Sequence, residues 1–183
     1  SQLLFDTWHP SLLHLNDLCP EMRFCLTELT GNNGVCFEAG DAETCPLPDR
    51  LDLLTSCSTL QWFVAPADFF GRSTALLRPG GVLAFSTFGL RNLHEIRTLT
   101  GNGLEYTPPE QLKKELEAAG YEVLYLEEEE AVLHFPTPID VLHHLRMTGV
   151  TGTEKHTWSR GRLQTFCDEY RNRFGSVEGV SLT

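Results

Sequence analysis

The chain has 183 residues, a length typical of one domain, and 41% of them are hydrophobic, which is too many for a disordered segment. Fourteen basic and 25 acidic residues give a net charge of −11, and such an excess disfavours nonspecific binding to nucleic acid or to anionic membranes. No apolar run reaches the roughly 18 residues of a membrane span, and the start has no signal-peptide pattern.

Strand patterns and helix patterns alternate over the first half of the chain. Residues 1–8 have the pattern of the remainder of a helix. We then predict a buried strand over 12–17, a helix over 20–29, strands over 35–38 and 51–56, a helix over 66–77 and a strand over 82–87. Strands separated by helices of this length form right-handed βαβ units, so we expect an α/β fold with a doubly wound, mostly parallel sheet.

The second half continues with longer helices. The pattern predicts a helix over 109–119 that Gly120 closes, one long or two short strands over 121–135, and helices over 139–147 and 160–174. The last residues, 179–183, have the pattern of a strand that has just begun. We expect one domain over 1–183.

Six cysteines are present: Cys19, Cys25, Cys36, Cys45, Cys57 and Cys167. None forms a C-x-x-C pair, and the spacings match neither a disulfide framework nor a zinc motif. We therefore predict free, buried thiols in a reducing cytoplasm, and no metal site.

Four segments, in this order, carry a resemblance to known proteins: HLNDLCPEM (14–22), FEAGDAETCPLP (37–48), LDLLTSCSTLQWF (51–63) and LLRPGGVLAFSTFG (76–89). They resemble the acidic strand end, the G-D-A-E loop, the fourth-strand segment and the R-P-G-G-x-L fifth-strand segment of class I S-adenosylmethionine-dependent methyltransferases. The resemblance implies a Rossmann-like fold and S-adenosyl-L-methionine as the cofactor.

Later segments resemble one branch of that family, the malonyl-[acyl-carrier-protein] O-methyltransferases of biotin synthesis. These segments are EEEEAVLHF (127–135), TPIDVLHHLRMTGVTG (137–152), EYRNRF (169–174) and GVSLT (179–183). The resemblance implies transfer of a methyl group to the free carboxylate of a malonyl thioester, with malonyl-acyl-carrier protein or malonyl-CoA as the acceptor.

The start and the end of the chain depart from the family pattern. Family members carry a strand and a G-x-G-x-G turn just before the helix that residues 1–8 would finish, and they continue into a final strand. We expect this chain to lack the first strand with its turn, and the last strand. The glycines let the backbone approach the methionine end of the cofactor, so we assign no residues to that end and expect the chain alone to bind the cofactor poorly.

The resemblance places the adenosine half of the cofactor at the ends of two strands. Asp17, with Leu18 beside it, would accept hydrogen bonds from both ribose hydroxyls; the alternative is a cap on the following helix. Asp41 would accept the adenine amino group, and the backbone N–H of Ala42 would meet a ring nitrogen; the alternative is an Asx-turn.

Further cofactor residues are expected after the next strand. Ser56 and Cys57 lie at its carboxyl end, where doubly wound folds bind ligands, and their backbone would face the methionine and sulfonium. Family members often have Asn where Cys57 stands. Gln61 is assigned to the cofactor, while Trp62 either packs against a bound ligand or fills the core.

Residues 146–173 carry six basic and three acidic side chains, a net charge of +3 in a chain that is acidic elsewhere. Either this segment is a solvated helix face with i,i+3 and i,i+4 pairs, or it binds the malonyl carboxylate and an acidic carrier protein. A planar guanidinium suits a carboxylate. Arg146 is therefore the first candidate and Arg160 the second, within a helical, acceptor-binding lid over 136–175.

The expected reaction needs no general base, because carboxyl pKa values lie near 4 and the acceptor is an anion at pH 7. We expect no catalytic residue in that sense, and catalysis by alignment and desolvation. Two alternatives stay open. One is another small-molecule methyltransferase of this fold, acting on a different acid or on a quinone ring. The other is a non-catalytic partner module, which the intact Asp17 and Gly40-Asp41-Ala42 oppose.

Overall fold

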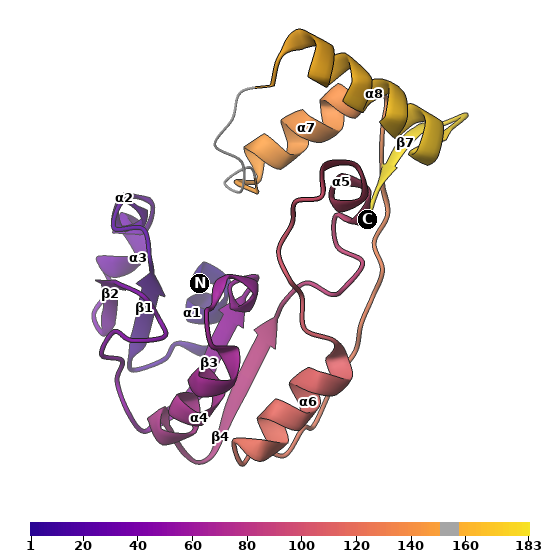
Figure 1. Cartoon of the computed structure of the whole chain (residues 1–183). Helices are drawn as coiled ribbons and strands as arrows, with labels where there is room; N and C mark the ends of the chain where they lie inside the picture. Colours follow the sequence, from indigo (N-terminus) through magenta and orange to yellow (C-terminus); the bar gives the residue numbers. More distant parts are fainter. Residues whose placement is uncertain (151–157) are drawn as a thin grey trace. The chain divides into compact units, whose positions relative to one another are not determined.

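The computed structural model describes residues 1–150 and 158–183, which fall into two compact units. The first unit contains Ser1–Cys57, Phe63–Phe85 and Ala118–Tyr121, and the second contains Ser58–Trp62, Ser86–Glu117 and Glu122–Thr183. Both units combine helices with strands (Figure 1).

The first unit carries two pairs of strands. Its elements are α1 (Gln2–Trp8), β1 (Leu13–Asp17), α2 (Met22–Cys25), α3 (Thr27–Thr30), β2 (Val35–Ala39), β3 (Leu51–Cys57), α4 (Pro66–Leu76) and β4 (Leu77–Ser86, whose last residue belongs to the second unit). β1 and β2 pair in parallel, from Leu13 opposite Val35 to Asp17 opposite Ala39. β3 and β4 form a second two-stranded sheet. Because β1 and β2 run in the same direction, their carboxyl ends lie at one edge of their sheet.

Helix α4 supplies much of the packing in the first unit. It begins with Pro66. Proline lacks an N–H, but at the first helical position an N–H would have no partner within the helix. The helix buries Phe69, Phe70 and Ser73. The ring of Phe70 stacks on Phe85 with 5.7 Å between centroids. The Ser73 hydroxyl lies 2.7 Å from the hydroxyl of Tyr121. Burial raises the pKa of Tyr121, and this hydrogen bond partly offsets the rise.

The second unit is dominated by helices. Its elements are the 3-10 helix η1 (Leu60–Trp62), α5 (His94–Thr100), α6 (Pro109–Ala118, whose last residue belongs to the first unit), β5 (Leu133–Phe135), α7 (Pro138–Met147), α8 (Arg160–Phe174), β6 (Gly175–Ser176) and β7 (Gly179–Leu182). β7 lies between β5 and β6 and is antiparallel to both.

Helices α7 and α8 and strand β7 share one apolar core. Its buried residues are Val141, Leu145, Phe166, Cys167, Tyr170, Val180 and Leu182. Edge-to-face contacts link Trp158 to Phe166, Phe166 to Tyr170 and Tyr170 to Phe174, with centroids 4.8, 5.5 and 5.4 Å apart. Such pairs are preferred over face-to-face stacking because the ring edge is positive and the ring face negative.

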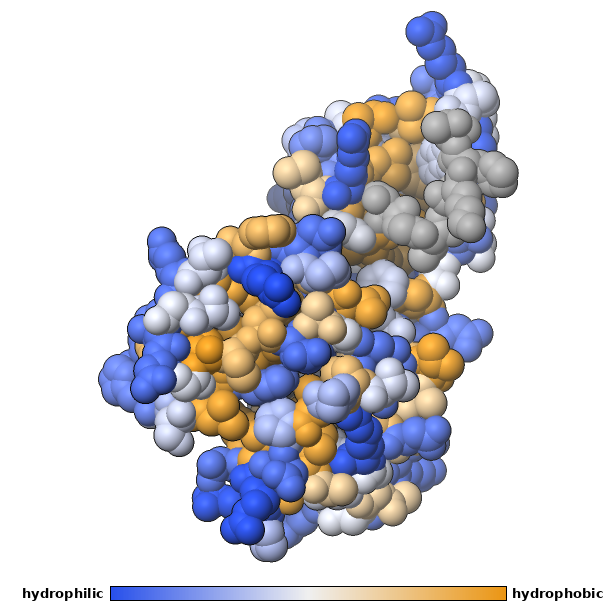
Figure 2. Space-filling view, turned by 90° about the vertical axis from the view of Figure 1, so that its left-hand side faces the viewer, coloured by the Kyte–Doolittle hydropathy of each residue, from blue (hydrophilic) through white to orange (hydrophobic). Residues whose placement is uncertain are grey.

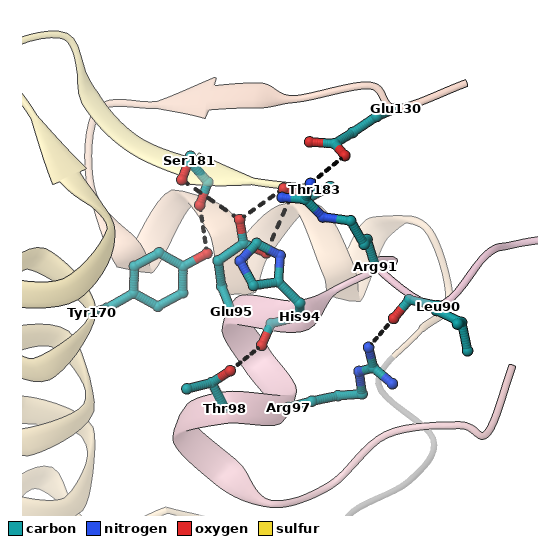
Figure 3. Close-up of polar contacts among 10 residues, drawn as sticks. All are labelled: Leu90, Arg91, His94, Glu95, Arg97, Thr98, Glu130, Tyr170, Ser181 and Thr183. Atoms are coloured by element: carbon teal, nitrogen blue, oxygen red, sulfur yellow. Dashed lines mark hydrogen bonds and ion pairs between the residues drawn. The ribbon is translucent and has the colours of Figure 1, made fainter. Parts of the chain in front are cut away.

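A buried carboxylate ties the end of the chain to this core (Figure 3). Glu95 of α5 is fully buried and accepts hydrogen bonds from the backbone N–H and the hydroxyl of Thr183, both at 3.1 Å. Its other neighbours are the hydroxyl of Ser181 at 3.5 Å and Nδ1 of His94 at 3.2 Å, the latter an ion-pair distance without directed hydrogen-bond geometry. Tyr170 donates to the carbonyl of Ser181 at 2.7 Å.

Most predicted elements are confirmed to within a few residues, and Gly120 adopts the left-handed conformation, φ +94°, that a helix-closing glycine uses. Three predictions were wrong in part. The helix over 20–29 is two short helices, because Leu26 departs from helical geometry at φ −110° and ψ 8°. Strand β4 starts five residues early, and only Leu133–Phe135 of 121–135 is a strand, because β7 pairs with no more of that segment. Helix α5 was not predicted.

The cysteine prediction was half correct. All six cysteines lie among the described residues and carry free thiols, but only Cys167 is buried, and four of the others are exposed. Free Cys favours burial only on average, and these side chains stand in short helices, loops or on outward-facing strand positions.

Other apolar side chains are exposed too, among them Leu3, Leu18 and Phe24, and Figure 2 shows apolar patches on the displayed face. None of the described helices has the length and apolar character needed to cross a membrane.

Candidate functional site

The edge at the carboxyl ends of β1 and β2 brings two predicted site segments together. The N–H of Gly40 donates to the carbonyl of Asp17 at 2.9 Å, which extends the strand pairing by one residue. The side-chain amide of Asn16 donates to the carbonyls of Glu38 and Gly40 at 3.1 and 3.0 Å. Asp17 and the loop that starts at Asp41 are therefore neighbours.

Asp17 shapes the turn that follows β1. Its Oδ1 accepts the backbone N–H of Cys19 at 2.8 Å. Helix α2 begins only at Met22, with Glu21 at the capping position, so Asp17 closes a turn and does not cap the helix. Its Oδ2 has no hydrogen-bond partner among the described residues, and the side chain is half-buried. Leu18 beside it is 75% exposed. One carboxylate oxygen thus holds the turn, and the other is available to a ligand.

The loop after Gly40 is a tight turn around Asp41. The Asp41 carboxylate accepts the N–H of Glu43 at 2.9 Å, and its carbonyl accepts the N–H groups of Thr44 and Cys45 at 3.0 and 2.7 Å. This is the Asx-turn alternative, and it leaves Oδ2 of Asp41 and the N–H of Ala42 without a partner in the described part of the chain. An acceptor and a donor, side by side, match the edge of an adenine ring.

Two charged residues that the sequence analysis did not single out hold this loop against helix α4. Glu43 accepts the N–H groups of Val64 and Ala65 at 2.9 and 2.8 Å. Arg72 donates to the carbonyl of Ala42 at 2.5 Å and to the carbonyl of Cys45. Burial raises the pKa of the Cys45 thiol, with the Arg72 charge opposing the rise. No spacing rule links residues about 30 positions apart, so local patterns carried no signal for this pair.

The remaining predicted cofactor residues divide between the units. Half-buried Ser56 and exposed Cys57 end β3 in the first unit, as predicted. Gln61 and Trp62 belong to the second unit. The Gln61 amide donates to the Ser58 carbonyl at 2.6 Å and accepts from the Thr87 hydroxyl at 3.3 Å, so both of its ends hold the backbone or a neighbouring side chain. Trp62 is 50% exposed and does not fill a core.

Arg146 and Arg160 lie at the helix ends that come directly before and after residues 151–157 in the sequence. Arg146 is in the last turn of α7 and Arg160 is the first residue of α8, and these ends lie on the same side of the helix pair (Figure 1). Both side chains are exposed and form no ion pair with any residue of 1–150 or 158–183. The predicted motif residues Thr151 and Gly152, and the charged Glu154 and Lys155, lie outside the described residues.

Two other basic residues of α8 already have partners. Arg171 lies 3.6 Å from Asp168, an i,i+3 pair, and Arg162 lies over the ring of Trp158 at 5.2 Å. A half-open cavity of about 230 Å³ adjoins this end of α8; it is lined by Leu99, Thr100, Trp158, Arg162, Thr165, Phe166 and Glu169. The solvated-face interpretation therefore holds for Arg171, while Arg146 and Arg160 remain the candidates for an anionic acceptor.

Comparison with known proteins identifies the family. A methyltransferase-domain profile matches residues 4–85. The malonyl-[acyl-carrier protein] O-methyltransferase of Bacteroides helcogenes is 50% identical over 194 aligned positions, which cover all of this chain and 70% of that protein. The protein of the same name from Bacteroides thetaiotaomicron is 47% identical, over all of this chain and 74% of that protein. The chain belongs to the malonyl-[acyl-carrier protein] O-methyltransferase family.

Solved structures establish the fold of this family member independently. The structure of the YcgJ protein of Bacillus subtilis superposes on 99% of this chain with a TM-score of 0.66 at 15% identity, and the match covers 80% of the YcgJ chain. A putative methyltransferase from Bacillus halodurans matches 92% of the chain and 77% of its own, with a TM-score of 0.59 at 20% identity. The fold is the Rossmann-like fold of methyltransferases, as the sequence predicted.

Proposed function

We propose that this chain performs the reaction for which its relatives are named. It transfers a methyl group from S-adenosylmethionine to the free carboxylate of a malonyl group on acyl-carrier protein, a step of biotin synthesis. The observation that carries this proposal is the 50% identity to the Bacteroides helcogenes protein over the whole chain, because acceptor specificity rarely changes while so much sequence is kept. We assign the reaction to the cytoplasm, and malonyl-CoA is a second acceptor of the same chemistry.

The residues at the β1–β2 edge fit the adenosine half of the cofactor. Oδ2 of Asp17 accepts from the ribose, Oδ2 of Asp41 accepts from the adenine amino group, and the Ala42 N–H donates to the ring. Exposed Leu18 covers one face of the base. We assign Ser56, Cys57 and Gln61 to the remainder of the cofactor site. When bound, S-adenosylmethionine supplies a methyl group on a positive sulfur.

The chemistry asks the protein to align groups and to exclude water. A carboxylate oxygen of the acceptor forms the new O–CH₃ bond while the S–CH₃ bond breaks, which gives a methyl ester and S-adenosylhomocysteine. The acceptor is already an anion, so no residue has to remove a proton. Arg146, with Arg160 and Trp62, orients the malonyl group, and residues 136–175 form the acceptor-binding lid of one methyltransferase domain over 1–183.

A methyl-transfer assay with purified natural protein tests this proposal. We expect mass spectrometry to show a malonyl methyl ester on acyl-carrier protein when S-adenosylmethionine is present. Succinyl-acyl-carrier protein and a phenolic quinone precursor are the matched alternative acceptors. Methylation of either of these without methylation of the malonyl thioester would assign the protein to a different small-molecule methyltransferase. Cofactor binding without transfer to any acceptor would make it a non-catalytic module.

A further inference from the structure

The loop from Asp41 to Cys45 is held by two charged side chains of opposite sign, one on helix α4 and one in the loop itself. Arg72, two turns into α4, reaches the carbonyls of Ala42 and Cys45. Glu43, inside the loop, reaches the N–H groups of Val64 and Ala65 just before α4 begins. All of these residues belong to the first unit, and Glu43 and Arg72 are both half-buried. The loop is thus fastened to one helix at two places by charge-assisted hydrogen bonds.

The contact of Arg72 bears directly on the carboxylate of Asp41. The carbonyl of Ala42 and the N–H of Glu43 belong to the same planar peptide group. Arg72 binds the carbonyl side of this group at 2.5 Å, and the N–H side donates to Oδ1 of Asp41 at 2.9 Å. Fixing the plane of one peptide therefore fixes the direction in which the Asp41 carboxylate points.

The contact of Glu43 anchors the same loop to the start of α4. Ala65 occupies the capping position and has no side-chain oxygen, and Pro66 has no N–H. The carboxylate of Glu43 accepts the two backbone N–H groups that directly precede the helix, at the helix end where a negative charge is favoured. Arg72 on the same helix then meets the loop at a set distance from that anchor.

We infer that Arg72 and Glu43 are positioning residues of the cofactor site, and that Arg72 acts on adenine recognition through the carboxylate of Asp41. This inference rests on the proposed function, because it takes the Asp41 loop as the adenine site. Neither residue touches the ligand in this arrangement; their contribution is to hold Asp41 in its binding orientation before the ligand arrives.

Calorimetric titration of the natural protein with S-adenosylhomocysteine tests the inference as a double-mutant cycle. We expect R72M to weaken binding by roughly tenfold, and R72K, which can reach one carbonyl but lacks the planar fork, to fall between R72M and wild type. E43Q keeps one acceptor oxygen and should weaken binding less than R72M does. In a D41A background, R72M should weaken the binding of S-adenosylhomocysteine by less than about twofold, because the carboxylate that Arg72 orients is gone.

Arg78→Met is the matched control. Arg78 is exposed in the same unit and pairs with Asp52 at 2.6 Å, so its loss should leave affinity unchanged. If R72M lowers the affinity by the same factor with and without Asp41, the inference is overturned, because a merely structural effect of Arg72 would be independent of Asp41. If R72M does not fold, the same comparison is made with R72K and with E43Q, each with and without D41A. Wild-type protein that binds no S-adenosylhomocysteine would instead refute the proposed function itself.

Discussion

In the proposed cofactor site, Asp17 has two tasks. One oxygen accepts the Cys19 N–H, and the other would accept from the ribose. We predict that Asp17→Ala weakens S-adenosylhomocysteine binding by about 1.5–3 kcal/mol, the scale of hydrogen bonds to a charged group. Calorimetric titration measures this, and thermal unfolding shows whether the variant folds.

Asp17→Asn is the control that separates the two tasks. Asn retains an oxygen for the Cys19 N–H but has no charge, so the fold should be kept while affinity falls. Unchanged affinity in both folded variants would remove Asp17 from the cofactor site.

The guanidinium of Arg146 is a second side chain whose role can be isolated. It is exposed at the end of α7 and forms no ion pair with any described residue. We predict that Arg146→Ala lowers kcat/KM for the malonyl thioester tenfold to a hundredfold, about 1.4–2.8 kcal/mol, because a carboxylate loses its planar partner. Steady-state kinetics with each substrate varied in turn measures this, and KM for S-adenosylmethionine should stay nearly constant.

Arg171→Ala is the matched control for Arg146, since Arg171 already pairs with Asp168. If Arg146→Ala impairs the use of both substrates equally, Arg146 is a structural residue. If it impairs the use of neither substrate, Arg160 becomes the candidate for binding the carboxylate.

The buried hydroxyl of Tyr170 on helix α8 forms a hydrogen bond to strand β7. Tyr170 donates to the Ser181 carbonyl, and burial, reinforced by the nearby Glu95 charge, raises the pKa of Tyr170 far above its usual value near 10. The folded protein holds this proton more tightly than the unfolded chain does. The resulting stability is fully present below about pH 10 and is lost as the pH rises above that value.

We therefore predict two effects of Tyr170→Phe. At pH 7 it should lower the free energy of unfolding by about 1 kcal/mol through the lost hydrogen bond. Above about pH 10 the variant should lose stability less steeply than wild type. Urea unfolding at both pH values measures this, with exposed Tyr125→Phe as the control. Parallel decline of Tyr170→Phe and wild type at high pH would show that Tyr170 is not the titrating group.

The distribution of charge over the chain bears on how a carrier protein would dock. The net charge is −11, yet residues 146–173 carry +3. An acidic carrier would be attracted to that segment and repelled elsewhere, which favours one orientation of encounter. Salt screens such attraction, since the Debye length falls from about 10 Å at 0.1 M to 3 Å at 1 M.

We predict that raising NaCl from about 0.05 to 0.5 M increases KM for malonyl-acyl-carrier protein about threefold or more, while KM for S-adenosylmethionine changes little. Charge reversal at Arg160 should reduce this salt dependence. Equal salt effects on both substrates, or none on the carrier, would show that the basic segment does not guide docking.

Local patterns accounted for most elements and for the candidate cofactor loop. The periodicity of α4, α6, α7 and α8, and the acidic residues at the ends of two apolar strands, are properties of short windows, and short windows decide helix and strand formation. The parallel pairing of β1 with β2 then places Asp17 next to the Asp41 loop without further information. Elements that need a distant partner were less predictable, as the shortness of β5 shows.

The amino-acid sequence was therefore sufficient for most of the elements and for the family. Only the folded chain shows that Arg72 holds the Asp41 loop across 30 positions, that Glu95 holds Thr183 across 88, and that Trp62 is exposed. The physical reason is the same for all three. Periodicity reports which face of an element is apolar, whereas contacts between distant residues depend on the path of the backbone in space, which no short window contains.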